Sequence, residues 1–421
     1  MSVYFSAFNR VTIVLALLAV CYAPRIQAQP SYDLLVKGGH VIDPKNEINS
    51  LMDVAVNDGV IEKVARRIPA SEAAQVVDAA GFYVTPGLID VHAHVFVGMV
   101  PRTFAGGFSS VSPDGFTFRS GVTTVVDPGT AGWRNFSAFR EQVIDQSATR
   151  ILAFLNIFGH GLTSGSGIHD HSDIDVEQAY ATVKEHPDII VGVRLGHYLG
   201  ESREPLDKAL ETAELAEVPF LLECHLPELP LKDILERMRP GDTVTHVFGD
   251  VGDRESILDE RNRVRDYVFE AKNRGIIFDV GHGGGSFHFS QAVPAMEQGL
   301  LPDTFGTDLH RSSMNGGMKN MLNILSKYLN MGMSVEDIIL RATWNAARSV
   351  RREDLGHLSP GAVADLAVLS IKQGEYGFVD AGGYRMDGSS RFETELTLRA
   401  GRIVWDLNGL TAPLWNQQAK K

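Results

Sequence analysis

Eight short apolar runs lie between Gly87 and Asp308, and the segments between them have helical patterning. The runs are Gly87–His92, Thr123–Asp127, Ile151–Phe158, Ile189–Leu195, Phe220–His225, Thr243–Phe248, Ile276–Val280 and Thr304–Asp308. Strands that alternate with helices form a parallel sheet covered by those helices. Eight such units match a TIM-type (β/α)8 barrel, whose typical size is about 250 residues. We therefore predict an α/β fold in which residues 86–356 form the barrel.

The two ends of the chain have a different pattern from its middle. Short strands and turns fill the stretch from Tyr32 to Val84, with one turn at Asn57-Asp58-Gly59. The same pattern returns after Gly356, where strands are expected over 364–370 and 396–406. We predict that segments 29–85 and 357–421 pair beside the barrel as one small β-sandwich domain. The alternative is two unrelated tails.

The first segment has the features of a secretory signal peptide. Arg10 precedes an almost wholly aliphatic run, Val11 to Ala19, which is too short to span a bilayer. Small residues and Ile26-Gln27-Ala28 follow, as at a cleavage site. We therefore predict that residues 1–28 are a signal peptide and that the mature protein is periplasmic or secreted. A buried N-terminal helix is the alternative.

Charge and cysteine content limit the partners of the chain. With 39 basic and 52 acidic residues, the 421-residue chain has a formal charge of −13, which repels nucleic acid and anionic membrane surfaces. Cys21 leaves with the signal peptide, so Cys224 has no partner for an internal disulfide. We expect a small-molecule substrate and neither a nucleic-acid partner nor, after signal removal, a membrane partner. A homo-oligomer is compatible with the sequence.

His92 and His94 end the first predicted barrel strand. Side chains two residues apart on a strand point the same way, so both imidazoles are expected to face the barrel interior. Active sites in this fold lie at the carboxyl ends of the strands, where two histidines could share a metal ion. Two core or surface histidines are the alternative.

Three further candidate ligands, His225, His246 and Asp308, stand at the ends of other predicted strands. Imidazole and carboxylate ligands suit zinc and its neighbours. A zinc ion lowers the pKa of its bound water to about 7, and Asp308 is suited to carry the proton to the leaving group. The set predicts hydrolysis of a carbonyl-type bond, with one or two zinc ions per chain as cofactor.

Several motifs give the chain a resemblance to a known family. They are residues 84–94 (Val-Thr-Pro-Gly-Leu-Ile-Asp-Val-His-Ala-His), 120–124, 343–347 and 360–366. Over nearly the whole mature chain the sequence resembles the amidohydrolase superfamily, and residues 278–284 and 307–310 resemble its deacetylase branch, related to dihydroorotases. The resemblance implies a metal-dependent hydrolase with five ligands: His92, His94, His225, His246 and Asp308.

Arg194 departs from the pattern of that family. Many binuclear members place a carboxylated lysine on strand four, and here that position is Arg194. Arginine offers only donors, so it cannot bridge two metals. The alternatives are a single-metal site or a bridge from Glu223, which shares a strand face with His225. Glu223 could instead be paired with Arg194 inside the barrel.

Three residues are candidates for substrate binding. The planar guanidinium of Arg194 suits bidentate capture of a substrate carboxylate, although a structural ion pair is equally compatible. His282 follows strand seven and stands at the correct end of the barrel to touch substrate. Glu228, in the sequence His225-Leu226-Pro227-Glu228, resembles the acid of single-metal aminohydrolases.

These features predict an exported amide-bond hydrolase, with esters cleaved by the same groups. The resemblance implies N-acyl amino acids or other small acylated compounds as substrates. Asp308 would pass the proton to the departing nitrogen. A cyclic-amide hydrolase of dihydroorotase or hydantoinase kind and a mononuclear deaminase are the enzymatic alternatives. A binding protein that kept the barrel and lost its chemistry is the alternative from another class.

Overall fold

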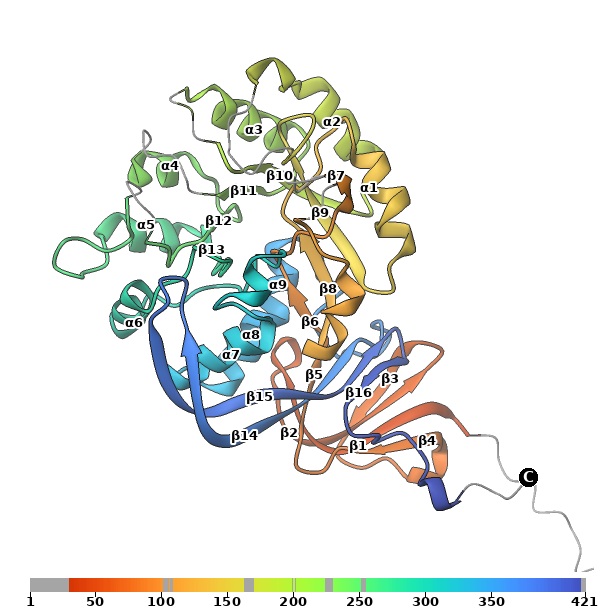
Figure 1. The fold of residues 1–421 in the computed structure, drawn as a ribbon. Helices are drawn as coiled ribbons and strands as arrows, with labels where there is room; N and C mark the ends of the chain where they lie inside the picture. Colours follow the sequence, from red (N-terminus) through yellow and green to blue (C-terminus); the bar gives the residue numbers. More distant parts are fainter. Residues whose placement is uncertain are drawn as a thin grey trace, which may run out of the picture.

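Parallel strands and helices alternate through the middle of the chain, as the sequence predicted (Figure 1). The computed structural model describes residues 30–100, 106, 109–162, 170–198, 200, 202–223, 230–250 and 255–417, and the predicted signal peptide lies outside them. Seven parallel strands are hydrogen-bonded in the order β13-β12-β11-β10-β9-β8-β6. Their bounds are β6 Leu88–Asp90, β8 Val122–Asp127, β9 Arg150–Asn156, β10 Ile190–Leu195, β11 Phe220–Glu223, β12 Thr243–Thr245 and β13 Ile277–Phe278.

Residues 304–309 close the barrel between its last and first strands. Parallel bridges join Thr304 to Asp279 on one side and Leu309 to Ala93 on the other. We predicted a regular strand at 304–308, whereas the structure has only isolated bridges there. The backbone N–H groups of Gly306 and Thr307 donate to the carboxylates of Asp279 and Asp90 and not to a neighbouring strand, and Asp308 then has a left-handed φ of 50°. The chain nevertheless forms the predicted (β/α)8 barrel.

Helices cover the outside of this barrel (Figure 1). They are α1 Phe136–Gln142, α2 Val176–Glu185, α3 Glu204–Leu215, α4 Leu231–Arg237, α5 Asp266–Arg274, α6 Phe289–Glu297, α7 Met321–Asn330, α8 Val335–Ala342 and α9 Trp344–Ser349. One buried cluster joins Val125 and Val193 of the strands to Ala209 of α3 and Ile324 of α7. Strands β8 and β10 are buried along their whole length, which explains their nearly continuous apolar runs.

The strands of the two chain ends share one sheet of order β16-β15-β14-β5-β1-β2-β3, with β4 paired to β1. The bounds are β1 Tyr32–Asp43, β2 Ile48–Asn57, β3 Val60–Ala65, β4 Ala73–Asp78, β5 Tyr83–Pro86, β14 Leu366–Val379, β15 Arg385–Arg399 and β16 Arg402–Asp406. Val84 of β5 pairs with Val368 of β14, which joins the two ends. They form one β domain, as predicted, in a single continuous sheet rather than two separate ones.

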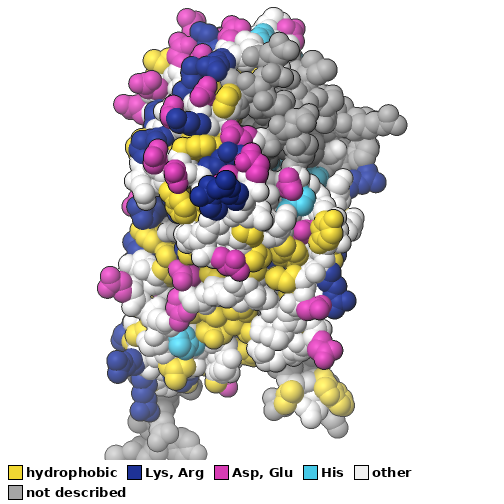
Figure 2. Space-filling view, turned by 90° about the vertical axis from the view of Figure 1, so that its left-hand side faces the viewer, with side chains coloured by type: hydrophobic (Ala, Val, Ile, Leu, Met, Phe, Trp, Pro, Cys, Tyr) yellow, Lys and Arg dark blue, Asp and Glu magenta, His cyan; other side chains and the backbone are white. Residues whose placement is uncertain are grey.

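Acidic and basic side chains intermingle over the part of the outer surface that Figure 2 shows. The longest described helix, α3, has 12 residues, whereas a transmembrane helix needs about 20. Within the described ranges, no helix has both the length and the apolar character to cross a bilayer.

Candidate metal centre

His92 and His94 follow strand β6, and each is only 1% exposed. Backbone hydrogen bonds hold this segment against the closing segment of the barrel. The N–H of His94 donates to the carbonyl of Leu309 at 2.9 Å, and the N–H of Asp308 donates to the carbonyl of His92 at 2.6 Å. Both histidines are therefore fixed relative to Asp308 by the closure of the barrel itself.

The two imidazoles converge on one carboxylate oxygen. The Nε2 atoms of His92 and His94 lie 3.6 Å and 3.3 Å from Oδ1 of Asp308. On the other side of each ring, Nδ1 is hydrogen-bonded to a threonine hydroxyl, that of Thr245 at 3.1 Å for His92 and that of Thr130 at 2.7 Å for His94. Such hydrogen bonds orient the rings and direct their Nε2 atoms towards a shared point.

The hydrogen bonds also define which ring nitrogen carries the proton. Thr245 donates its hydroxyl proton to Asp279 at 2.7 Å, so it accepts from Nδ1 of His92. Nδ1 of His246 lies 2.5 Å from the carbonyl of Gly281, which can only accept. In both rings Nδ1 is therefore the donor, and Nε2 of the neutral imidazole offers a lone pair.

His92, His246 and Asp308 form a cluster with the composition and dimensions of a metal site. One ligand atom from each lies within 4.8 Å of the others. Nε2 of His92 is buried and has no hydrogen-bond partner in the part of the chain that is described. Buried polar atoms rarely go unsatisfied, so this nitrogen fits a ligand to a metal ion.

Burial sets the protonation of these groups in favour of metal binding. Loss of hydration lowers the pKa of His92 and lowers that of His94 to about 4, so both rings are neutral at pH 7. Burial opposes ionisation of Asp308, but its contact with His310 outweighs this effect and holds the pKa of the carboxyl well below the usual range. The site therefore presents neutral imidazoles beside a carboxylate, the forms that ligate metal.

Arg194 and Glu223 meet inside the barrel. The Arg194 side chain, 0% exposed, donates to Oε2 of Glu223 and to the carbonyl of Pro128. The other carboxylate oxygen of Glu223 lies 3.3 Å from Nε2 of His246 and 3.2 Å from Nε2 of His197. Burial lowers the pKa of Arg194 to about 10, so the guanidinium keeps its charge at neutral pH. Glu223 thus lies between a buried cation and a candidate metal ligand.

His282, predicted to touch substrate, is fully buried after strand β13. Its Nδ1 lies 3.0 Å from the carbonyl of Gly283, and its Nε2 lies 2.6 Å from Nζ of Lys327 on helix α7. Burial and the positive charge of Lys327 hold the pKa of His282 well below the usual range. The ring is therefore neutral and accepts a hydrogen bond from the lysine.

Two predicted site residues, His225 and Glu228, lie outside the described part of the chain. Other residues of the site are described in the structure but were not predicted from the sequence. His310 is one of them: its Nδ1 lies 2.8 Å from the carbonyl and 3.3 Å from Oδ1 of Asp308. Its position two residues after Asp308 is a signal that could have found it. Thr130, Thr245 and Lys327 had no such signal, because only the fold brings them to the histidines.

Comparisons with known proteins relate the chain to one group of enzymes. Residues 256–402 match the model of the Amidohydrolase family. A deacetylase of Agrobacterium fabrum is 33% identical over 347 residues, which are 80% of this chain and 83% of the relative. The crystal structure of an adenine deaminase has a TM-score of 0.80 and 28% identity, covering 89% of this chain and 100% of that one. A dihydroorotase structure has a TM-score of 0.78 and 28% identity, covering 89% and 99%.

Proposed function

Because this chain belongs to the amidohydrolase family and so is a metal-dependent hydrolase of carbon–nitrogen bonds, we propose that it removes the acyl group from small N-acylated compounds such as N-acyl amino acids. The observation that carries the proposal is the cluster of His92, His246 and Asp308, whose ligand atoms lie within 4.8 Å of one another. The similarity to a protein named a deacetylase supports an acyl group as the part removed. Esters of similar shape fit the same chemistry.

We propose zinc, one or two ions per chain, as the metal. His92, His246 and Asp308 would hold it, with His94 beside them and His225 as a further ligand. Glu223 is the candidate for a bridge if two ions bind, because one of its oxygens lies 3.3 Å from Nε2 of His246. When bound, zinc supplies an activated water nucleophile at neutral pH and polarises a carbonyl oxygen.

Asp308 is the proposed proton carrier. Its carboxylate is ionised at neutral pH, so it can accept a proton from the attacking water and release it to the departing nitrogen. His310 lies 3.3 Å from Oδ1 of Asp308 and holds the carboxylate in its charged form. Both side chains are largely buried, so bulk water does not compete for the proton.

Substrate recognition is proposed for three residues. Arg194 could bind a substrate carboxylate only by exchanging its contact with Glu223, because the pair is already formed. His282 would contact the substrate from the loop after β13, beside the segment that carries Asp308. Glu228 would serve as the acid if the reaction were a deamination.

Product analysis of the zinc-loaded protein tests the proposal. The substrates are a panel of N-acetyl amino acids, hydantoin, dihydroorotate and adenine. We expect free acetate and amino acid from the first group. Ammonia from adenine would replace the proposal by a deaminase, which the adenine deaminase structure makes the second candidate. Ring opening of dihydroorotate would favour a cyclic-amide hydrolase. Binding of the acetylated compounds with no turnover would indicate a binding protein that has kept the barrel and lost its catalytic activity.

We further propose that the protein is exported, with residues 1–28 removed as a signal peptide. The apolar run after Arg10 supports this location. N-terminal sequencing of the protein recovered from a periplasmic fraction is expected to begin near Gln29. A mature protein that still begins at Met1 would contradict it.

A further inference from the structure

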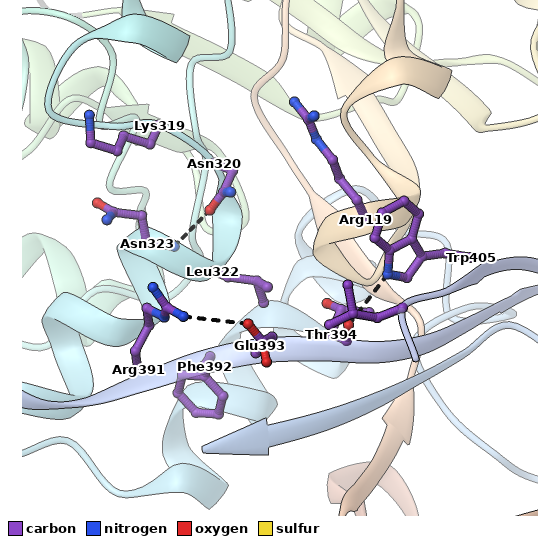
Figure 3. Close-up of a pocket in the computed structure, with 11 residues that line it drawn as sticks. Arg119, Lys319, Asn320, Leu322, Asn323, Arg391, Phe392, Glu393, Thr394 and Trp405 are labelled. Atoms are coloured by element: carbon purple, nitrogen blue, oxygen red, sulfur yellow. Dashed lines mark hydrogen bonds and ion pairs between the residues drawn. The ribbon is translucent and has the colours of Figure 1, made fainter. Parts of the chain in front are cut away.

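A cavity of about 360 Å³ lies where the barrel meets the β domain (Figure 3). Its walls come from the 3-10 turn Phe118–Ser120, the start of α7, and strands β15 and β16. Its lining does not include His92, His94, His246 or Asp308. Junctions between domains are frequent ligand sites, and a volume of about 300–1,000 Å³ is typical of them. The cavity is therefore a second candidate site, apart from the metal centre.

The lining of the cavity is positively charged. Three cations, Arg119, Lys319 and Arg391, line it against a single carboxylate, that of Glu393. Arg391 lies 3.4 Å from Glu393, whereas Arg119 and Lys319 form no ion pair with any described residue. In a chain with a formal charge of −13, this excess of cations favours an anionic ligand.

Helix α7 adds to this positive potential at its first turn. Asn320, Leu322 and Asn323, from the start of the helix, line the cavity. Asn320 caps the helix by accepting a hydrogen bond from the N–H of Asn323. The N-terminus of a helix carries a partial positive charge and binds anions. Figure 3 shows Lys319 and Arg391 on the same side of the cavity as this helix end.

Two polar atoms in the wall are buried without a partner. They are Oγ1 of Thr394, a residue only 2% exposed, and Oδ1 of Asn323. Neither has a hydrogen-bond partner among the residues that the structure describes. A buried hydroxyl without a hydrogen bond is costly, and a ligand that reached Oγ1 of Thr394 would remove this cost.

The remaining wall is apolar and aromatic. Trp405, Leu322 and Leu407 line it, and Nε1 of Trp405 donates to the carbonyl of Thr394 at 3.4 Å. Figure 3 shows Arg119 and Trp405 together on the wall opposite Lys319. An indole ring and a guanidinium both suit contact with a planar group.

We propose that this cavity binds a small organic anion. Its carboxylate is held by Lys319, Arg391 and the N-terminus of α7, and its planar apolar body lies against Trp405 and Leu322. The hydroxyl of Thr394 donates a hydrogen bond to the ligand. This site does not depend on the reaction at the metal centre.

The test uses 4-bromobenzoate as the probe, with the zinc-loaded protein. Crystals soaked in the probe are examined by anomalous diffraction at the bromine edge, and its dissociation constant is measured by calorimetry. We expect bromine in the cavity and an affinity reduced at least about tenfold in the Lys319→Gln/Arg391→Gln double variant. Arg67→Gln, which changes an exposed arginine of the β domain, is the matched control and should leave the affinity unchanged.

Bromine found only outside the cavity, or equal affinity in the double variant, would overturn the proposal. Inorganic phosphate is the second probe, and it should compete weakly because it lacks the planar body. Phosphate that binds more tightly than 4-bromobenzoate in the same cavity would overturn the organic part of the proposal.

Thr394→Val tests whether the hydroxyl of Thr394 serves ligand binding or only the fold. The substitution keeps the shape of the side chain and removes its buried hydroxyl. We expect the probe to bind several-fold more weakly while the melting temperature stays equal or rises, because no hydrogen bond is lost in the free protein. A lower melting temperature with unchanged affinity would show that the hydroxyl serves the fold and not a ligand.

Discussion

Arg194 and Glu223 form an ion pair inside the barrel, with side chains 0% and 2% exposed. The pair occupies the place where the family resemblance led us to expect a bridging lysine. An arginine cannot take that role, but here it holds a carboxylate 3.3 Å from Nε2 of His246. The ion pair and the metal centre are therefore parts of one buried network.

Removal of the arginine should destabilise the fold. Arg194→Met leaves the Glu223 carboxylate without its buried cation, so we expect the free energy of unfolding to fall by about 3–5 kcal/mol. Urea denaturation measures it. The matched control is Arg385→Met, which breaks an exposed ion pair with Asp387 and should change stability by at most about 0.5 kcal/mol. An Arg194→Met variant as stable as the wild type would mean that the pair contributes nothing.

Glu223→Gln distinguishes a metal site with two ions from a site with one. If Glu223 bridges, elemental analysis should find about two zinc ions per chain in the wild type and about one in the variant. The reason is that the amide keeps the shape of the side chain but loses the charge of a bridging carboxylate. About one ion in both proteins would establish a mononuclear site.

Thr245 is predicted to tune zinc affinity through His92. Its hydroxyl accepts from Nδ1 of His92 and donates to Asp279. Thr245→Val breaks this chain, and zinc affinity should fall about 10–100-fold, as measured by competition with a chelator. Thr304→Val is the matched control, because Thr304 donates to the same Asp279 at 2.8 Å without reaching the histidine. Equal losses in both variants would argue against orientation of His92.

Lys327 should give the protein a distinctive pH dependence of stability. Burial lowers its pKa from 10.5 to about 7, so above pH 7 the folded protein has released a proton that the unfolded chain still holds. The free energy of unfolding therefore rises with pH, by about 2 kcal/mol between pH 7 and pH 9. Lys327→Met should lack this rise in urea denaturation. Parallel profiles for the two proteins would show that the lysine titrates near its ordinary pKa.

The barrel was predictable where the chain is buried on both faces. We predicted strands at 123–127 and 189–195, and the structure has Val122–Asp127 and Ile190–Leu195. Continuous apolar runs bounded by turns define such strands well. The segment at 304–308 was the exception, since the backbone N–H groups of Gly306 and Thr307 donate to the buried carboxylates of Asp279 and Asp90, contacts that an apolar pattern does not reveal.

The site was predictable as far as residue type and strand position determine it. His92, His246 and Asp308 stand at strand ends and lie together in the structure. The hydroxyl of Thr245 and the amine of Lys327 come from residues far from their partners in sequence, on an ordinary strand and an ordinary amphipathic helix. Contacts of this kind depend on how the loops and helices are placed in the fold, and a local sequence pattern does not specify that placement.

His92, His246 and Asp308 are proposed to hold a metal that is required for hydrolysis of an amide bond. The most direct measurement is the rate of N-acetyl amino acid hydrolysis as chelator-stripped protein is titrated with zinc. We predict no turnover without zinc, saturation as zinc binds, and a rate at least about 100-fold lower in Asp308→Asn. Asp387→Asn, at an exposed position, should behave as wild type. Full activity of the stripped protein, or wild-type activity of Asp308→Asn, would contradict a metal-dependent reaction at this site.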